Sequence, residues 1–485
     1  MAYQLKNEDL APTPASKRTW NKWDIAALWV GMSICIPTYT IASGLVAQGH
    51  PLMLAVFAIA LGNVLVLLPM LVNAHAGTKY GVPFPVLLRS SFGVIGCNIP
   101  AMMRAMVACG WFGIQSWIGG KAIHLMFVAL LPSSWTLPVV FPSWFGISMA
   151  EFLCFVGFWA INVAIIARGI ETLRVVEKLA APILIAMGLG LFAWALIKVG
   201  WSDMTRSDVL RGGKAKMSAW DTLAAGMTIG VAYWGTLALN IPDFARFAKS
   251  QRDQVIGQTL GLPPTMTAFV FIGATVTTAS FFVFGAAIAD PVVLISKIGG
   301  PALLVVAMFA IALATLSTNL AANIVGPAND ISNLAPNKIS FKTGAFIAAG
   351  VGLVMMPWKL YRDATSYLFA WLGGYGVLLG AVGGIMIFDY VFIRRGKLDV
   401  DELYERNGQY EYKGGFNYVA LGAFLIGVLP NLPGFLHYLV KMETSSTFLK
   451  IYSWGWFVAF GLAGVSYLVG MRVFYPNSGP AKTHE

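Results

Sequence analysis

The sequence predicts an all-α polytopic membrane protein, and three observations support this class. Of its 485 residues 57% are hydrophobic and only 11% are charged, whereas soluble domains carry about 25% charged residues. Several apolar runs, among them 52–73, 260–288 and 303–325, exceed the ~20 residues that a helix needs to cross a bilayer. Basic residues gather in alternate loops, which is typical of helical membrane proteins.

Segment counting predicts 12 transmembrane helices. In chain order they cover approximately 24–47, 52–76, 97–131, 150–168, 175–199, 220–243, 262–288, 298–326, 341–357, 365–393, 416–438 and 450–472. Between the second and third helices, residues 80–96 are amphipathic and rich in proline and glycine. This stretch predicts a re-entrant or interfacial helix on the inner face.

The net charge of +11 reflects membrane topology, and it does not predict nucleic-acid binding. Basic residues fill the N-terminal tail and alternate loops, while the loops 48–51 and 132–148 contain none. This asymmetry predicts a multi-pass protein of the cell membrane, surrounded by membrane lipids, with both termini cytoplasmic. One loop, 200–219, departs from the pattern, because it carries Arg206, Arg211, Lys214 and Lys216 on the predicted outer side.

The four cysteines predict buried free thiols. Cys35, Cys97, Cys109 and Cys154 all lie in or beside apolar segments, and their spacing is not that of metal ligands.

One interrupted apolar segment occurs twice in the chain. The stretch WDIAALWVGMSICIPTYT covers 23–40, and a weaker copy, WDTLAAGMTIGVAYWGT, covers 220–236. Each begins with Trp-Asp and contains a Gly-Met-hydroxyl-Ile tetrad. The second copy begins five spans after the first, and because five is odd, the two halves of the chain are expected to be inverted relative to each other.

Both copies are expected to be broken helices. Pro37 removes a backbone donor in the first span, and Gly230 and Gly235 loosen the sixth. Freed backbone groups cannot face lipid, so they line a cavity. Paired broken helices in inverted halves indicate the midplane site of a transporter. Ordinary helix kinks are the alternative explanation.

Two polar clusters could form that site. In the third span Trp111 and Gln115 are four residues apart on one helix face, and in the sixth Trp234 directly precedes Gly235. An aromatic plane beside a carboxamide suits a flat hydrogen-bonding solute. A polar contact between helices, or simple packing of the tryptophan, would use the same residues.

The eighth span carries a second set of oxygens. Ala314, Ser317 and Thr318 share one helix face. Asn323 lies about 140° around the helix axis from Thr318 and ~7.5 Å further along it. Hydroxyl and carbonyl oxygens suit a hard monovalent cation, while the carboxamide suits a solute. Hydroxyls that bond within their own helix are the alternative.

At these residues the chain resembles a known family. The stretches GWFGIQSW, YWGTLALNIPDFARF and LSTNLAANIVGPANDISNLAP are similar to those of the nucleobase–cation symporters, which include hydantoin, allantoin, cytosine and uracil permeases. The resemblance covers about 20–475 and is nearest to the bacterial allantoin permeases.

The resemblance implies a LeuT-type fold, a five-plus-five inverted repeat followed by two C-terminal helices. The expected organisation is a cytoplasmic tail (1–22), a first repeat with helices 1–5 (23–199), a second repeat with helices 6–10 (220–393), helices 11–12 (416–472) and a cytoplasmic tail (473–485).

The family also implies a solute site. A flat heterocycle would lie between Trp111 and Trp234, with Gln115 and Asn323 pairing with its N–H and C=O edges. The implied sodium site uses Gly31, Ile34, Ala314, Ser317 and Thr318. Hydantoin-type members carry a glutamine just after the first-span carbonyls, where this chain has Cys35, which argues against hydantoin itself.

The expected function is therefore cation symport of a nucleobase or cyclic ureide, with allantoin first, then uracil or hydantoin. Sodium is the expected coupling ion; protons are the alternative, because His75, His124 and Lys121 lie in apolar spans. An amino-acid or amine symporter of the same fold is the second hypothesis. No motif of an enzyme appears, and no cofactor or obligatory protein partner is expected.

Overall fold

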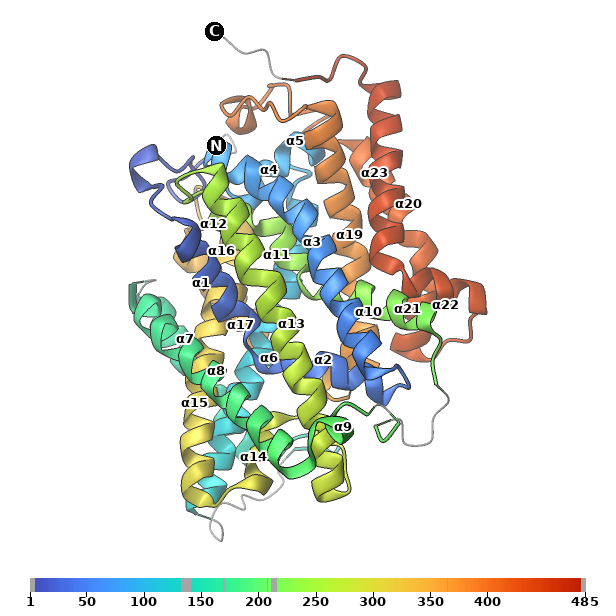
Figure 1. The fold of residues 1–485 in the computed structure, drawn as a ribbon. Helices are drawn as coiled ribbons and strands as arrows, with labels where there is room; N and C mark the ends of the chain where they lie inside the picture. Colours follow the sequence, from blue (N-terminus) through green and yellow to red (C-terminus); the bar gives the residue numbers. More distant parts are fainter. Residues whose placement is uncertain are drawn as a thin grey trace.

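A computed structural model describes residues 5–131, 141–168, 171–206, 208–210, 216–363 and 365–480. This part of the chain is helical and contains no sheet strand, so the predicted all-α class is confirmed (Figure 1). Arg211 and Lys214 of the unusual basic loop, and the last five residues of the C-terminal tail, lie outside the described residues.

The helices of the first half begin with a bent pair. They are α1 (Lys22–Ser33), α2 (Ile36–Ala47), α3 (Leu52–Tyr80), α4 (Phe84–Leu87), α5 (Arg89–Phe92), α6 (Asn98–Leu130), α7 (Met149–Arg168), α8 (Glu171–Val199) and α9 (Trp201–Met204).

The second half also begins with a broken helix. Its elements are α10 (Ala219–Tyr233), α11 (Gly235–Asn240), α12 (Pro242–Ala245), α13 (Gln251–Phe284), α14 (Pro291–Ile298), α15 (Pro301–Asn323), α16 (Val325–Leu334), α17 (Phe341–Val354), α18 (Pro357–Leu360), a π-helical segment (Thr365–Leu372), α19 (Gly373–Phe388) and a second π-helical segment (Asp389–Ile393). Four helices complete the chain: α20 (Tyr418–Val428), α21 (Leu432–Val440), α22 (Ser446–Ser453) and α23 (Gly455–Phe474).

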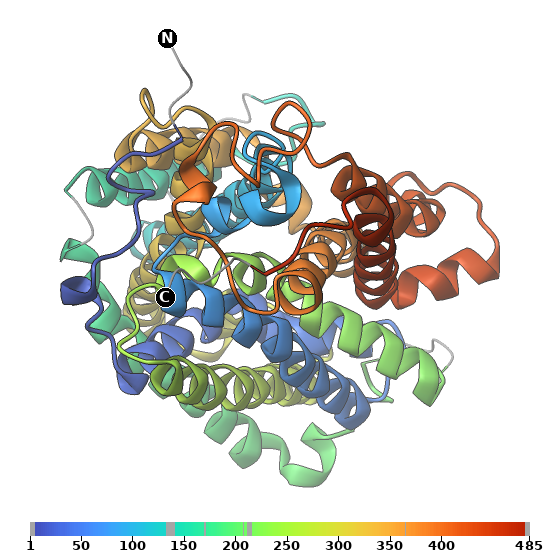
Figure 2. The ribbon, with the colours of Figure 1, turned by 90° about the horizontal axis from the view of Figure 1, so that it is seen from above.

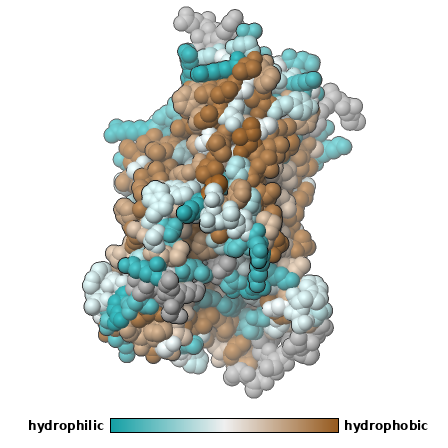
Figure 3. Space-filling view, turned by 90° about the vertical axis from the view of Figure 1, so that its right-hand side faces the viewer, coloured by the Kyte–Doolittle hydropathy of each residue, from teal (hydrophilic) through white to brown (hydrophobic). Residues whose placement is uncertain are grey.

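Helix length and composition agree with a membrane protein. Among the described residues seven helices are long and apolar enough to cross a bilayer, and α1 with α2, bent by 55°, makes an eighth. In Figure 3 hydrophobic side chains cover much of one face, with hydrophilic ones gathered toward its ends. The count of 12 spans stays a prediction.

Both predicted breaks are present, at slightly different places. A capping box between Asn21 and Asp24 starts α1. The first span then breaks at Ile34 and Cys35, and Pro37 lies in the first turn of α2, where its missing N–H has no consequence. The sixth span breaks at Trp234, between α10 and α11.

Gly230 does not loosen the sixth span as expected. A Cβ at this position would lie 2.8 Å from the carbonyl oxygen of Ile59, and one on Gly62 would lie 2.6 Å from that of Met227. The two glycines therefore let α10 and α3 approach backbone to backbone.

The 80–96 stretch is buried rather than interfacial. It folds into the short helices α4 and α5, whose residues are all buried. The backbone N–H of Asn417 donates to Phe92 and that of Gly96 donates to Gly415, so the segment before α20 covers it. The four cysteines are buried and free, as predicted.

The helices form a bundle with a smaller appendage. Both termini lie at the same end, and α20 to α23 project to one side of the remaining helices (Figures 1 and 2). Within the bundle α1 packs against α13, because Gly257 and Gly261 leave room for Ile25 and Trp29. The broken helices are thus each supported by one long, continuous helix.

Candidate functional site

A small cavity lies where the two broken helices meet α6 and α15. It is lined by Met32, Cys35, Trp111, Gln115, Tyr233, Trp234, Thr236, Leu237, Thr318, Ala322 and Asn323. The fold thus brings together all four side chains predicted to bind the solute, with Thr318 of the cation set. The volume of about 30 Å3 is enough for roughly two water molecules, so the cavity is too small for a heterocycle in this conformation.

Tyr233 occupies the space between the two tryptophans. Its ring centroid lies 5.3 Å from that of Trp111 and 5.0 Å from that of Trp234, both edge to face. The rings of Trp29 and Tyr367 complete the aromatic box, against Trp234 at 5.1 Å and against Trp111 at 6.1 Å. Tyr233 is not among the residues predicted from the sequence, although its position directly before the predicted break is a usable signal.

The hydroxyl of Tyr233 holds this ring against α2. It lies 2.9 Å from the hydroxyl of Thr38 and 3.2 Å from the thiol of Cys35. Cys35, at the position where glutamine was expected in hydantoin-type relatives, therefore has a tyrosine partner from the other repeat. The two broken helices are joined by this contact.

Two polar atoms in the cavity have no protein partner. They are the side-chain oxygen of Gln115 and the indole N–H of Trp234, both fully buried. An unsatisfied buried donor or acceptor costs about 1–3 kcal/mol, so each gains from a ligand. Asn323 donates to Asn319 at 3.0 Å, which fixes its amide and directs its own oxygen away from Asn319. The site offers an acceptor and a donor without charge.

Two of the predicted cation ligands meet near the break in the first span. The hydroxyl of Thr318 donates to the carbonyl of Gly31 at 3.1 Å, and Ile34 ends α1 at its final turn. Ser317 and Ala314 are buried on the same helix. The buried hydroxyl of Ser33 has no partner. Neutral oxygens of this kind fit a sodium ion, which prefers hard ligands.

A second cavity of about 230 Å3 lies toward the end opposite the termini. Lys121 and Asp290 form an ion pair across it at 2.5 Å. Tyr367 lines this cavity and contacts Trp111 of the inner one. A single aromatic layer thus separates the two spaces.

Buried charges lie on the other side of the inner cavity. Arg104 and Asp330 pair at 3.4 Å with no solvent exposure, and the Arg104 guanidinium occupies the place of a Cβ on Gly326. Asp243 accepts from the backbone N–H of Phe84 at 3.0 Å. The residue analysis did not single out Arg104, because one arginine in an apolar helix has no informative spacing.

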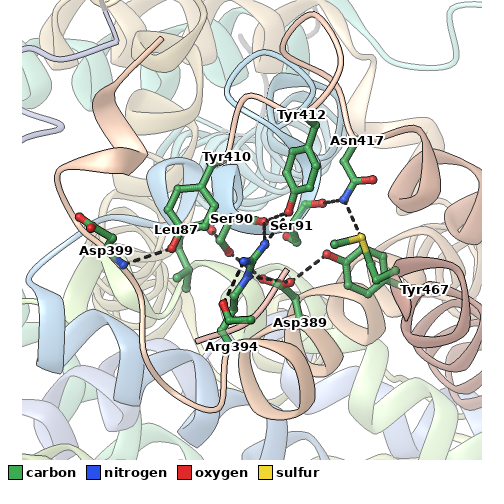
Figure 4. Close-up of polar contacts among 12 residues, drawn as sticks. Leu87, Ser90, Ser91, Asp389, Arg394, Asp399, Tyr410, Tyr412, Asn417 and Tyr467 are labelled. Atoms are coloured by element: carbon green, nitrogen blue, oxygen red, sulfur yellow. Dashed lines mark hydrogen bonds and ion pairs between the residues drawn. The ribbon is translucent and has the colours of Figure 1, made fainter. Parts of the chain in front are cut away.

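A polar network closes the end that carries the termini (Figure 4). Asp389 accepts hydrogen bonds from Tyr467 at 2.9 Å and from Ser90 at 3.0 Å. Arg394 pairs with Asp389 at 3.3 Å and donates to Tyr412 at 2.7 Å. Burial lowers the pKa of Arg394, but the Asp389 carboxylate raises it more, so this pKa lies above its ordinary value. The network ties the segment after α19 to α5 and α23.

Residues 12–459 match the family described as permeases for cytosine/purines, uracil, thiamine and allantoin. The chain belongs to this family. Among its relatives, the purine-uracil permease of Arabidopsis thaliana is 41% identical over 96% of this chain and 78% of the relative. The allantoin permease of Bacillus subtilis is 38% identical over 99% and 96%.

A solved permease structure confirms the fold. The transporter Mhp1 of the nucleobase-cation-symport-1 family, in a closed conformation with bromovinylhydantoin bound, superposes with a TM-score of 0.76 at 27% identity, covering 97% of each chain. The predicted resemblance and the LeuT-type arrangement are thereby confirmed. As a permease of this family, the protein is a multi-pass membrane transporter of small heterocycles and not an enzyme.

Proposed function

We propose that the protein imports a cyclic ureide, with allantoin as the first candidate and uracil or hydantoin next, by cation symport with alternating access. The observation that carries this proposal is the chemistry of the inner cavity. Its described lining has aromatic and amide groups but no charged side chain. The free oxygen of Gln115 and the free indole N–H of Trp234 complement the N–H and C=O groups of a neutral ureide.

The same lining argues against the amino-acid or amine hypothesis. A zwitterion or an ammonium group would be desolvated here without an opposite charge, which is costly. The identity to an allantoin permease along nearly the whole chain supports the ureide. Cys35, which stands where hydantoin-type members carry a glutamine, supports allantoin or uracil over hydantoin.

Sodium is the proposed coupling ion, bound by Gly31, Ile34, Ala314, Ser317 and Thr318. The adjacent oxygens of Gly31 and Thr318 support this assignment. Bound there, sodium would link α1 to α15, and the solute would bind beside it. The chain's own residues would do the rest: Trp111 and Trp234 hold the solute plane, and Gln115 orients it.

The proposed topology keeps both tails, 1–22 and 473–485, in the cytoplasm. The two repeats, 23–199 and 220–393, would together form the transport core, and 416–472 would form a separate helix pair. No nucleic acid and no obligatory protein partner take part in this scheme. The inner cavity would then open to the second, 230 Å3 cavity when it faces outward.

The test is uptake into proteoliposomes of the purified protein. We expect labelled allantoin to accumulate with an inward sodium gradient, and unlabelled uracil or hydantoin to compete more weakly. Leucine should not compete, and choline in place of sodium should reduce uptake. Accumulation of leucine but of no ureide would refute the proposed solute class.

A further inference from the structure

A long apolar groove runs between α3 and α13 on the outer surface of the bundle. It has a volume of about 750 Å3, and its walls come from these two helices. Phe57 and Val64 of α3 line it and are 57% and 48% exposed. Such a hollow would be filled by hydrocarbon in a bilayer.

Two adjacent prolines lie in the wall of the groove. Pro263 and Pro264 lie inside α13, where proline removes backbone hydrogen bonds and bends a helix. The hydroxyls of Thr259 and Thr267, both in the groove, donate to carbonyls of their own helix. The groove wall is therefore hydrocarbon in character even where its side chains are polar.

The groove continues into a third cavity, of about 550 Å3, at the end that carries the termini. This cavity is lined by Leu71, His75, Gln251 and Arg395, among others. His75 follows Phe57 by eighteen residues, which is five helical turns, so both lie on one face of α3. On α13, Val255 of the third cavity is one turn from Thr259 of the groove. The two spaces form one channel along the same helix pair.

The third cavity is positively charged. Arg395 forms no ion pair with any carboxylate in the described chain, whereas its neighbour Arg394 turns inward to Asp389 (Figure 4). Arg395 has a left-handed backbone, with φ of 51°, which is uncommon for a residue other than glycine. Lys79 adds a second positive charge, held by the carbonyl of Gly396 at 2.8 Å.

The ionisable neighbours Asp253 and His75 contact groups other than Arg395. Asp253, in the first turn of α13, accepts hydrogen bonds from the hydroxyl of Ser250 and the backbone N–H of Lys22. The imidazole of His75 contacts the hydroxyl of Tyr390 at 2.8 Å. The arginine is therefore free to bind an anion from outside.

We propose that this channel binds one phospholipid with an anionic headgroup. The phosphate would meet Arg395 and Lys79, and one acyl chain would run past Leu71 to the near end of the apolar groove at Leu67. From Lys79 to Leu67 is about 18 Å along α3, which is close to half of the ~30 Å hydrocarbon core and hence to one leaflet. Basic pockets between membrane helices are suited to anionic headgroups.

A lipid in this position would affect the stability of the bundle. α3 packs on α10 through Gly62, and α13 packs on α1 through Gly261. A lipid between α3 and α13 therefore joins the two helices that support the broken spans. We expect it to stabilise the bundle and not merely to coat it.

The experiment uses the purified full-length chain in detergent, with palmitoyl-oleoyl phosphatidylglycerol, the matching phosphatidylcholine, or soluble glycerol 3-phosphate. Native mass spectrometry counts bound lipid, and thermal unfolding reports stabilisation. We expect phosphatidylglycerol to be retained and to raise Tm more than phosphatidylcholine. Arg395→Gln should reduce its retention about fivefold, the factor for one basic side chain at a membrane surface.

Matched variants separate the groove from general lipid contact. Val72→Trp fills the part of the channel nearest Arg395 and should abolish retention; if it fails to fold, Arg395→Gln alone decides. Arg472→Gln, on exposed α23, should behave as wild type. Equal retention of both lipids, unchanged retention in Arg395→Gln, or equal stabilisation by glycerol 3-phosphate would overturn the proposal.

Discussion

The hydroxyl of Thr318 donates a hydrogen bond to the main-chain carbonyl of Gly31 across 3.1 Å. Thr318 belongs to α15 and Gly31 to α1, which are far apart in the chain. This contact makes the proposed cation site a junction between the two repeats. It also lies on the wall of the inner cavity, so ion and solute would share one residue.

Replacing Ser317 and Thr318 together by alanine should uncouple ion and solute. In wild type we expect sodium to raise solute affinity, and the solute to raise sodium affinity by the same factor. The double variant should lose this mutual effect but keep weaker solute binding. Titration of purified protein in sodium and in choline measures it, with Thr315→Ala as control. A wild type that responds to pH but not to sodium would indicate proton coupling.

Gln115→Leu should weaken solute binding by about 1–3 kcal/mol, because a buried solute group loses its partner. Stability should change little, since the Gln115 oxygen has no protein partner to lose. Asn323→Ala should weaken binding similarly but also lower Tm, because the buried side-chain oxygen of Asn319 loses the donor that Asn323 supplies. Calorimetric titration and thermal unfolding distinguish the two variants. Wild-type affinity in both would place the solute elsewhere.

Tyr233→Phe should increase solute affinity. The Tyr233 hydroxyl anchors its ring between the tryptophans through Thr38 and Cys35, and the ring fills space that a heterocycle needs. Loss of one such hydrogen bond destabilises the closed arrangement by about 0.5–1.5 kcal/mol, or up to about tenfold in affinity. Thr38→Val removes the same bond and should act in the same direction. Reduced binding in both variants would show that the hydroxyl contacts the solute.

Stability should fall in mild acid because of His50. Burial lowers the pKa of His50 to about 4, while Asp221 raises it less; Nδ1 contacts the hydroxyl of Thr222 at 3.0 Å. The unfolded chain takes up a proton near the ordinary histidine pKa, so the stabilisation is complete above pH 6.5 and is lost as pH falls toward 4. The loss at pH 5 is about 2 kcal/mol.

Thermal unfolding at pH 7.5 and pH 5 tests this expectation. His50→Gln should show a smaller difference in Tm between the two pH values than wild type. No change between pH 7.5 and pH 9 is expected from this group. An equal acid loss in the variant would assign the effect to other residues.

Gly62→Ala should destabilise the protein, whereas Gly157→Ala should not. A Cβ on Gly62 would meet the carbonyl of Met227 at 2.6 Å, while nothing lies within 4 Å of one on Gly157. Overpacking costs about 1–3 kcal/mol, and alanine otherwise favours a helix by up to about 1 kcal/mol. Thermal unfolding of the pair measures the difference, and a similar Tm in both would contradict close packing of α3 on α10.

Much of the fold could be predicted because its signals are local. Apolar runs identify the long helices, and the repeated Trp-Asp segments identify both broken spans. The break at Cys35 was placed near Pro37 because proline is the visible breaker, although it serves here as a first-turn residue. The burial of α4 and α5 could not be predicted, since their cover comes from Gly415 and Asn417, more than 300 residues away.

The candidate site shows the same limit. Trp111, Gln115, Trp234 and Asn323 have recognisable spacing and meet in one cavity. Tyr233 gains its importance from Thr38, on a helix of the other repeat, and a single chain gives no measure of such pairing.

The glycine contact of α3 with α10 determines where motion is possible. At Gly62 and Gly230 the two backbones touch directly, with no side chains between them that could slide past each other. We therefore expect α3 and α10 to move as one body. Angular change during a transport cycle is then left to the joints at Cys35 and Trp234, where no regular helix resists bending. The protein thus has two flexible joints and one rigid contact between α3 and α10, and the proposed solute site lies beside both joints.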